Sequence, residues 1–435
     1  GVVTDRGRVA TPVTLADAAP MTAGLIGDPS FEAPDGRGDP GLAAGERARL
    51  VVTIVWDGGG WNTLREHPDS WPTLRSLMSK GSGYVNATIG STPSNTPPIH
   101  TTLGTGAFPR THGIPHVKMR TASGDYVDPF EGDDASEVRV PSLADVYDPT
   151  TGNEAQVGVV ATVNWHLGMI GRGAGAPGGD RDLAVLLNAQ GLTYGNDELY
   201  EIPAVGDPVA LEAATEQLDV ADGEADGRWK DDDLSDPAVR YATPAFIDYQ
   251  QQILERVIAE RGFGADEIPD LLYVNFKQVD DAGHRWGLRS PQVAANIEAS
   301  DRALERLTAF LDRQVGRGRW AVAVTADHGQ TLYPHQSGGW PIAGGELAAD
   351  IEREFSDDGV DVFRVISSGI FLADRAALTD GTAQRVGEWV AGYTAGENLP
   401  GGKEMPEGWE GREDERLFSA VLAGREVVAS VCENG

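Results

Sequence analysis

Four apolar, β-branched runs constrain the fold of this chain more than any other feature of the sequence. They lie in residues 50–60, 156–162, 270–276 and 320–329. Continuous apolar runs of this kind are typical of parallel strands that are buried on both faces. Helical patterns separate the runs. The pairs Thr243-Pro244 and Ser290-Pro291 mark the starts of two of these helices. The alternation predicts an α/β fold, a three-layer αβα sandwich with a mostly parallel central sheet.

The domain organisation is less regular in the middle of the chain. The length of 435 residues allows one large α/β domain, and we expect a single domain over 1–435. Two stretches, 118–140 and 171–240, are acidic and glycine-rich, which predicts solvated surface loops. A calcium site in the acidic run is the alternative, although the run lacks the spacing of an EF-hand loop. We expect residues 118–270 to contain an inserted cap or substrate-specificity region.

The composition excludes several kinds of partner. The formal net charge of −32 disfavours binding to nucleic-acid backbones and to anionic membrane surfaces. No apolar run approaches the ~20 residues of a membrane-spanning helix. The single cysteine, Cys432, allows no intrachain disulfide. The chain begins with Gly1 rather than Met, which leaves open whether a leader was removed, and we expect the protein to be extracytoplasmic or secreted. The oligomeric state stays open.

Acidic and histidine residues follow the predicted strands. Ligands bind at the carboxyl ends of strands in open parallel sheets, so these side chains are expected at one edge. Mixed carboxylate and imidazole donors suit two divalent ions of the zinc or manganese kind. Each residue alone has a plainer interpretation, such as a turn cap or a surface histidine, and only their combination favours a metal site. The candidate ligands are Asp57, Asp280, His284, Asp327, His328 and His335.

The segment STPSNTPPIH, residues 91–100, places Thr96 before two prolines. Proline is tolerated in the first turn of a helix, so the plain interpretation is a helix capped by this threonine. The functional interpretation is a nucleophile at the positive end of a helix, where the amides of the first turn would face a phosphate.

Four segments, in this order, carry a resemblance to a known family: VWDGGG, NTPPIHTTLGTGAFPRTHGI, DDAGH and TADHGQ. The chain resembles the alkaline phosphatase superfamily, and most closely its type I phosphodiesterase/nucleotide pyrophosphatase branch, over roughly residues 50–120 and 270–345. The resemblance implies an alkaline phosphatase-like fold, a threonine nucleophile at Thr96 and two divalent ions, with zinc favoured over manganese. It assigns Asp57, Asp327 and His328 to one ion, and Asp280, His284 and His335 to the other.

The chain departs from the pattern of the family in one place that concerns the substrate. Phosphodiesterases of the family have an asparagine about twenty residues after the nucleophile, where this chain reads IPHVKM. His116, Lys118 and Asn95 are therefore the candidate substrate-binding residues. Lys277, next to the predicted strand 270–276, is expected to face solvent, although a phosphate contact is the alternative. His166 is expected to be a hydrogen-bonded loop histidine.

Together these features predict a metal-dependent phosphoryl hydrolase that acts on a small-molecule phosphate ester. A phosphodiesterase or nucleotide pyrophosphatase is the first hypothesis. A phosphomonoesterase or a phosphonate hydrolase could use the same site. A phosphomutase and a non-catalytic binding protein are the remaining alternatives.

Overall fold

The structure is a computed structural model of the 435-residue chain. It describes residues 6–28, 30–39, 41–42, 47–121, 125–221, 223–366, 369–373, 381–401, 403–422 and 424. The chain forms two compact units, Gly1–Thr331 and Leu332–Gly435, and each is described here by itself. We expected one domain over 1–435, so this division is a finding that the sequence patterns did not indicate.

A six-stranded sheet forms the centre of the first unit, with the strand order β10-β9-β8-β13-β3-β14. Five of the strands are parallel, and β10 at one edge pairs antiparallel with β9. The strands are β3 (Leu50–Trp56), β8 (Val157–Ala161), β9 (Leu183–Leu187), β10 (Thr193–Tyr194), β13 (Asp270–Phe276) and β14 (Trp320–Thr325). This arrangement confirms the predicted α/β class and the mostly parallel sheet.

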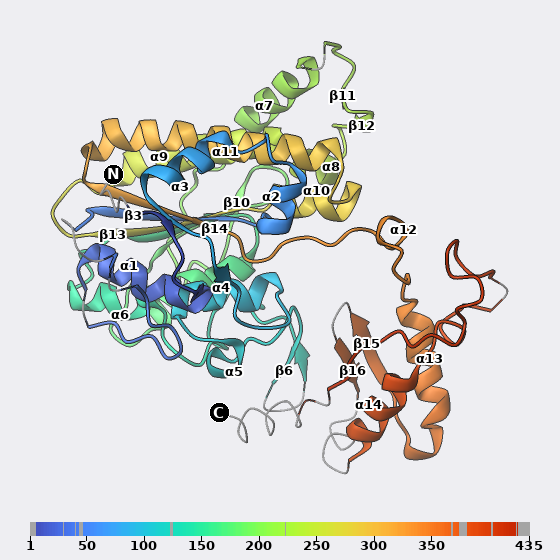
Figure 1. The fold of residues 1–435 in the computed structure, drawn as a ribbon. Helices are drawn as coiled ribbons and strands as arrows, with labels where there is room; N and C mark the ends of the chain where they lie inside the picture. The colour runs from blue at the N-terminus through green and yellow to red at the C-terminus, as the bar shows by residue number, and fades with distance from the viewer. Residues whose placement is uncertain are drawn as a thin grey trace. The chain divides into compact units, whose positions relative to one another are not determined.

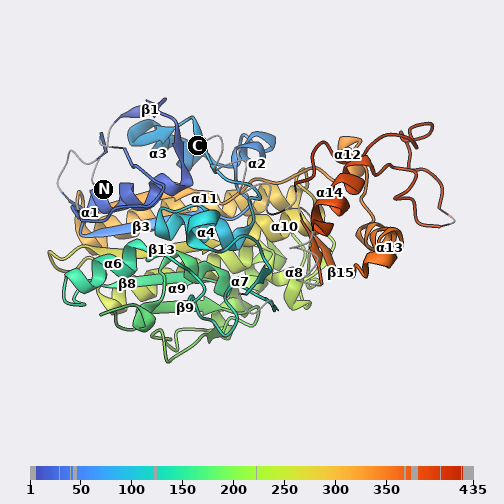
Figure 2. The same cartoon turned by 90° about the horizontal axis from the view of Figure 1, so that it is seen from below.

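Two hydrophobic cores cover the two faces of the sheet, because alternate strand residues point to opposite faces. In β3, Leu50, Val52 and Ile54 belong to one core and Val51 and Val55 to the other. Figures 1 and 2 show helices on both sides of the sheet. The first core contains residues of α2 (Trp61–Glu66), α3 (Pro72–Lys80), α7 (Pro208–Val220), α9 (Pro244–Arg261), α10 (Gln278–Trp286) and α11 (Pro291–Leu311). The second core contains residues of α1 (Ala18–Ile26), α4 (Thr96–Thr105), α6 (Leu143–Thr150) and the 3-10 helix η2 (Asn164–Met169).

Two helix starts agree with the sequence pattern. Thr243 is the N-cap of α9, and Ser290 is the N-cap of α11, where its hydroxyl accepts a hydrogen bond from the Val293 N–H. In both helices proline occupies the first turn, where its missing N–H costs no helical hydrogen bond. These two boundaries were therefore predictable from local chemistry alone.

The prediction of surface loops over 171–240 was wrong in part. Strand β9 lies within this stretch and is buried in the central sheet, and α7 packs against α9. The apolar run of β9 has only five residues and acidic and basic neighbours, so its composition resembled the surrounding loops. The described residues of the acidic run 219–237 are mostly exposed, and they include the short hairpin of β11 (Arg228–Trp229) and β12 (Asp232–Asp233). The cap or specificity role of 118–270 stays a prediction.

Shorter elements complete the first unit. They are β1 (Gly7–Val9), β2 (Val13–Thr14), η1 (Leu15–Asp17), β4 (Ser82–Tyr84), β5 (Ala87–Thr88), α5 (Pro109–His112), β6 (Met119–Arg120), β7 (Tyr126–Val127), η3 (Gly173–Gly175), α8 (Pro237–Tyr241) and the π-helix η4 (Asp312–Gly316).

The second unit has a small core of its own, formed by residues such as Leu347, Ile351 and Val386. Its two described strands pair antiparallel with each other in a separate two-stranded sheet. The elements are α12 (Pro334–Ser337), α13 (Gly344–Glu354), η5 (Ser356–Asp358), β15 (Val362–Ile366), β16 (Gly369–Leu372) and α14 (Thr382–Gly392). Within the described ranges of both units, we find no helix that combines the length and the apolar character needed to cross a bilayer.

Candidate active site

Helix α4 brings Thr96 to the carboxyl edge of the sheet. The helix begins at Thr96 itself, and Asn95 is the N-cap, so the prediction that Thr96 caps the helix was wrong by one residue. Every residue of α4 is buried. The helix lies very close to η2, because a Cβ atom at Gly104 would come within 2.4 Å of the carbonyl oxygen of Gly168. Glycine at this position therefore allows the end of α4 to pack closely against η2.

Three side chains, Asp57, Asp327 and His328, meet beside Thr96. Asp57 follows β3 and Asp327 comes two residues after β14, and both carboxylates are fully buried. One donor atom from each of the three lies within 4.8 Å of the others. Asp327 Oδ1 accepts hydrogen bonds from the N–H groups of Gly58 and His328, at 3.1 and 2.9 Å, while its Oδ2 accepts none from the described residues. Burial, together with the neighbouring Asp57 carboxylate, raises the pKa of Asp327.

The ring of His328 points one nitrogen into this cluster. Its Nδ1 donates to the carbonyl oxygen of Gly329 at 2.8 Å, which leaves the Nε2 lone pair for the cluster. Nε2 lies 3.2 Å from Asp327 Oδ2, 3.6 Å from Asp57 Oδ1 and 3.5 Å from Thr96 Oγ1. A nitrogen and two carboxylate oxygens therefore converge next to the threonine hydroxyl.

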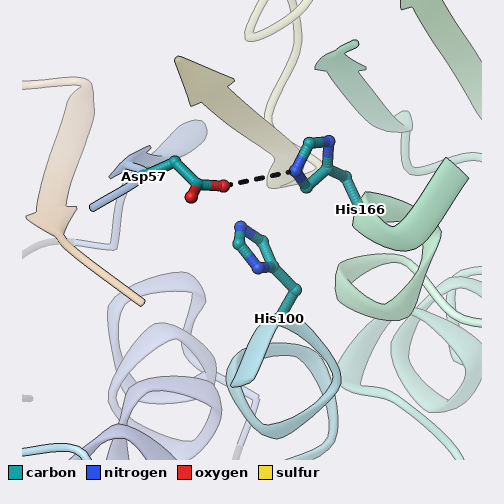
Figure 3. A group of neighbouring side chains, drawn as sticks. All are labelled: Asp57, His100 and His166. Carbon is teal, nitrogen blue, oxygen red and sulfur yellow. Dashed lines mark ion pairs between the residues drawn. The ribbon is translucent and has the colours of Figure 1, made fainter. Parts of the chain in front are cut away.

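A buried asparagine and two buried histidines surround the other oxygen of Asp57. Asn275 Nδ2 donates to Asp57 Oδ2 at 3.1 Å and lies 2.8 Å from His100 Nε2. His100 Nδ1 donates to the carbonyl oxygen of Thr96 at 2.8 Å. Figure 3 shows that His166 also points at Asp57, and its Nε2 lies 3.6 Å from Oδ2. Burial lowers the pKa of His166 to about 3, so this ring is neutral near pH 7.

Lys277 lies in the middle of the cluster. Its side chain is 8% exposed, so the prediction that it faces solvent was wrong. The Nζ atom lies 2.8 Å from Asp57 Oδ1, 2.5 Å from Asp280 Oδ2 and 3.3 Å from Thr96 Oγ1. Burial lowers the pKa of the ammonium, but the surrounding carboxylates, Asp57 and Asp280 foremost, together raise it by more, so that it lies well above the usual range. Burial also raises the pKa of Asp57, but Lys277 and the neighbouring histidines together lower it by more, so that it lies well below the usual range.

Asp280 and His284 lie one turn apart on α10. Asp280 is buried, and its Oδ1 lies 3.4 Å from His284 Nε2 and 3.9 Å from His328 Nε2. The side chain of His284 is 78% exposed. Gly58 allows the main chain of α10 to approach, because its φ is +68° and a Cβ atom there would lie 3.0 Å from the Cα atom of Asp280.

The remaining predicted residues lie around or outside this cluster. Asn95 Nδ2 lies 2.6 Å from His116 Nε2, so the structure pairs these two candidate substrate-binding residues. Lys118 forms an ion pair with Asp128 at 2.7 Å. His335 lies in α12 of the second unit, where its ring is 5.6 Å from that of Tyr333. Its assignment to an ion, and the roles of the other three residues, stay predictions.

A comparison with protein families identifies the core that carries this cluster. The model of the type I phosphodiesterase/nucleotide pyrophosphatase family matches residues 51–362, well over half of the chain. The chain belongs to this family. The predicted membership is thereby confirmed, and the matched range contains every residue of the cluster.

Two curated relatives match short parts of the chain. Alkaline phosphatase PafA of Elizabethkingia meningoseptica is 36% identical over 78 residues, which are 18% of this chain and 14% of the relative. Alkaline phosphatase PhoV of Synechococcus elongatus is 34% identical over 65 residues, 15% of this chain and 12% of the relative. These matches span a small fraction of either relative, so they say nothing of the whole enzymes.

The fold also resembles a solved structure. The crystal structure of wild-type PafA aligns with a TM-score of 0.63 and 19% identity, and covers 79% of this chain and 76% of PafA. At this level of identity the comparison shows the fold alone, and it confirms the predicted alkaline phosphatase-like architecture.

Sequence reasoning missed the inner positions of Lys277, Asn275, His100 and His166. One signal was available for Asn275, because a polar residue in a strand with buried faces needs hydrogen-bonding partners. Lys277 lies just after β13, as the N-cap of α10, so strand alternation gave no signal for its direction. The positions of His100 and His166 depend on the packing of α4 against η2, which no local pattern indicates.

The side chains present fit one divalent ion well and a second ion poorly. Asp57, Asp327 and His328 offer mixed donors of the kind that zinc and manganese take, including the Asp327 Oδ2 that accepts no hydrogen bond from the described residues. At the other expected site, Lys277 already contacts Asp280, and the His284 side chain is mostly exposed. We therefore derive no chemistry from a second ion.

Proposed function

We propose that the protein is a metal-dependent phosphoryl hydrolase with Thr96 as the nucleophile, and that it acts as a phosphodiesterase or nucleotide pyrophosphatase. One observation carries the proposal. The Thr96 hydroxyl lies at the start of α4, 3.5 Å from His328 Nε2 and 3.3 Å from Lys277 Nζ, beside two buried carboxylates. Membership of the type I phosphodiesterase/nucleotide pyrophosphatase family supports this class of reaction.

The residues of the chain divide the chemical work between them. The Thr96 hydroxyl loses its proton to solvent, its oxygen forms a bond to phosphorus, and the bond from phosphorus to the leaving oxygen breaks. Water then hydrolyses the phosphothreonine and restores the hydroxyl. The Lys277 ammonium favours the alkoxide form of Thr96 through its positive charge. A divalent ion bound by Asp57, Asp327 and His328 would add Lewis-acid stabilisation of the reacting oxygens.

The start of α4 contributes less than the sequence suggested. We expected the amides of the first turn to face the phosphate, but Pro97 and Pro98 have no N–H group. The next amide, of Ile99, donates to the carbonyl oxygen of Asn95 within the helix. Positive charge at the nucleophile must therefore come mainly from side chains and from a bound ion.

Zinc is the proposed ion, with manganese as the alternative, because both ions accept two carboxylates and an imidazole. The substrate is a small-molecule phosphate ester. The paired Asn95 and His116 side chains, one and twenty residues from the nucleophile, are available to bind its phosphate oxygens. An extracytoplasmic location stays a prediction from the sequence.

A phosphomonoesterase is the second candidate function. Two relatives that match the chain in sequence are named alkaline phosphatases, which favours monoester cleavage. The chain also has His116 and Lys118, and no asparagine, where the resemblance places the asparagine of the phosphodiesterases.

Hydrolysis assays distinguish these possibilities. Bis-p-nitrophenyl phosphate and p-nitrophenyl phosphate would be tested with the metal-free wild type, with added zinc or manganese, and with Thr96→Ala. We expect turnover that needs a metal and falls by a factor of about 1,000 or more in Thr96→Ala. Diester cleavage supports the phosphodiesterase, and monoester cleavage alone supports the phosphatase. Full activity of Thr96→Ala would contradict the mechanism in either case.

A further inference from the structure

The ammonium group of Lys277 is held by three oxygens that belong to three different segments. Asp57 follows β3, Asp280 lies in the first turn of α10, and Thr96 begins α4. The contacts to these oxygens are 2.8, 2.5 and 3.3 Å long. An ammonium has three N–H donors, so these contacts use its full donor capacity. The lysine is therefore a fixed component of the cluster rather than a surface side chain that bends inward.

We propose that the Lys277 ammonium takes the place of a second metal ion, so that each chain binds one divalent ion, at Asp57, Asp327 and His328. The inference rests on the proposed function for the roles of Thr96 and of that ion. It goes beyond the proposed function because it assigns the second positive charge at the nucleophile to a side chain. It also departs from the two-ion arrangement that the resemblance implied.

The contacts of Asp280 argue against an ion at this residue. One oxygen, Oδ2, is in contact with Lys277 Nζ, and the other lies 3.4 Å from His284 Nε2. Lys277 Nζ also contacts Asp57 Oδ1, at 2.8 Å, so the two positions differ in their other ligands. Donor atoms of Asp327 and His328 converge with one of Asp57 within 4.8 Å, whereas among the described residues no such group of three includes Asp280. Among the described residues of the first unit, the remaining expected ligand is His284, whose side chain is 78% exposed.

The position of Lys277 also suits a role towards the substrate. Its Nζ lies 3.3 Å from Thr96 Oγ1, so a phosphoryl group at this oxygen would lie within reach of the ammonium. Lysine binds phosphate as a compact point charge. Because Pro97 and Pro98 remove two backbone donors, the lysine supplies a donor that this helix start lacks.

Metal content tests the inference without an activity measurement. The full-length wild type, Asp327→Asn, Asp280→Asn, Lys277→Met and the surface control Lys80→Met would be dialysed against zinc, and separately against manganese. Bound metal per folded chain would then be measured by elemental analysis. We expect one ion in the wild type and in Lys80→Met, the loss of that ion in Asp327→Asn, and its retention in Asp280→Asn.

Activity of the same variants completes the test. We expect Lys277→Met to retain the ion and its turnover to fall by a factor of at least about 100. A loss of this size is typical when one hydrogen-bond donor that stabilises the developing charge is removed from an active site. Circular dichroism checks that each variant is folded, and if Lys277→Met is not, the wild type and Asp280→Asn still decide the number of ions. Two ions in the wild type, loss of the ion in Asp280→Asn, or unchanged turnover in Lys277→Met would each overturn the inference. Absence of any ion from the wild type would overturn the proposed function as well, whereas two ions with turnover that depends on Thr96 would overturn this inference alone.

Discussion

The hydroxyl oxygen of Thr96 lies 3.5 Å from the Nε2 atom of His328, although 232 positions separate the two residues in the sequence. The start of α4 and the end of β14 bring them together at one edge of the parallel sheet. Since the Nδ1 atom of His328 donates to the Gly329 carbonyl oxygen, Nε2 is the atom that is available to a metal ion. This relationship makes His328 the most direct place to test the proposed ion site.

Replacement of His328 by glutamine removes the nitrogen that faces Thr96. We expect the affinity for zinc to fall by a factor of at least about 100, and phosphate-ester turnover to fall by a factor of about 1,000. Competition with a chromophoric chelator measures the first quantity, and initial rates measure the second. His67→Gln is the matched control, because the ring of His67 contacts a backbone carbonyl oxygen, that of Leu288. Unchanged zinc affinity in His328→Gln would exclude His328 as a ligand.

Asn275→Leu tests the buried support of Asp57. The asparagine donates to Asp57 Oδ2 and contacts His100 Nε2, so leucine leaves both groups without this partner. We expect zinc affinity to fall by a factor of about 10–100, and the free energy of unfolding to fall by about 1–3 kcal/mol. Metal competition and urea unfolding of the metal-free protein measure the two effects separately. A variant with wild-type affinity and stability would show that Asn275 does not hold Asp57 in place.

Gly104→Ala tests the close approach of α4 to η2. The new methyl group would come within 2.4 and 2.5 Å of the carbonyl oxygens of Gly168 and Met169, which are backbone atoms that cannot turn away. We expect a loss of about 1–3 kcal/mol in the free energy of unfolding, accompanied by lower turnover because α4 carries Thr96. Gly345→Ala in α13 is the matched control, since the space around that glycine is open. Equal stability of the two variants would show that α4 and η2 separate at little cost.

Asp148→Asn tests the pH dependence that an acidic group in the first unit imposes on stability. Burial, and then the neighbouring Asp180 carboxylate, raise the pKa of Asp148 to about 7, whereas the unfolded chain has the ordinary value of about 4. The folded state therefore binds a proton more tightly than the unfolded state does. The stability that this proton provides is present below about pH 4 and is lost as the pH rises through about 7.

The measurement compares melting temperatures of the metal-free wild type and Asp148→Asn between pH 5 and 8. We expect the variant to gain a few degrees relative to the wild type at pH 8, and to lose this advantage towards pH 5. The difference between the two proteins at each pH removes the contribution of other titrating groups. A difference that does not change with pH would show that Asp148 titrates normally.

Much of the core could be predicted because its determinants are local. The apolar runs of β3, β8, β13 and β14, and the proline-marked starts of α9 and α11, are sequence patterns, and the structure contains each of them. Asp57, Asp280 and Asp327 follow from the rule that parallel strands present their carboxyl ends at one edge. The strand β9 was missed because five apolar residues that follow the charged segment 180–182 do not stand out from a loop.

The sequence by itself determined four of the parallel strands, the starts of α9 and α11, the family and the residue types at the edge of the sheet, because these depend on periodicity and spacing. Only the tertiary structure decided that Lys277 turns inward to Asp57, Asp280 and Thr96, and that His100 and His166 meet at Asp57. The physical reason is that burial of a charged side chain depends on compensating charges from distant segments. Asp280 is only three positions from Lys277, but Asp57 is 220 positions away, and no local pattern reports how far its carboxylate lies from the ammonium.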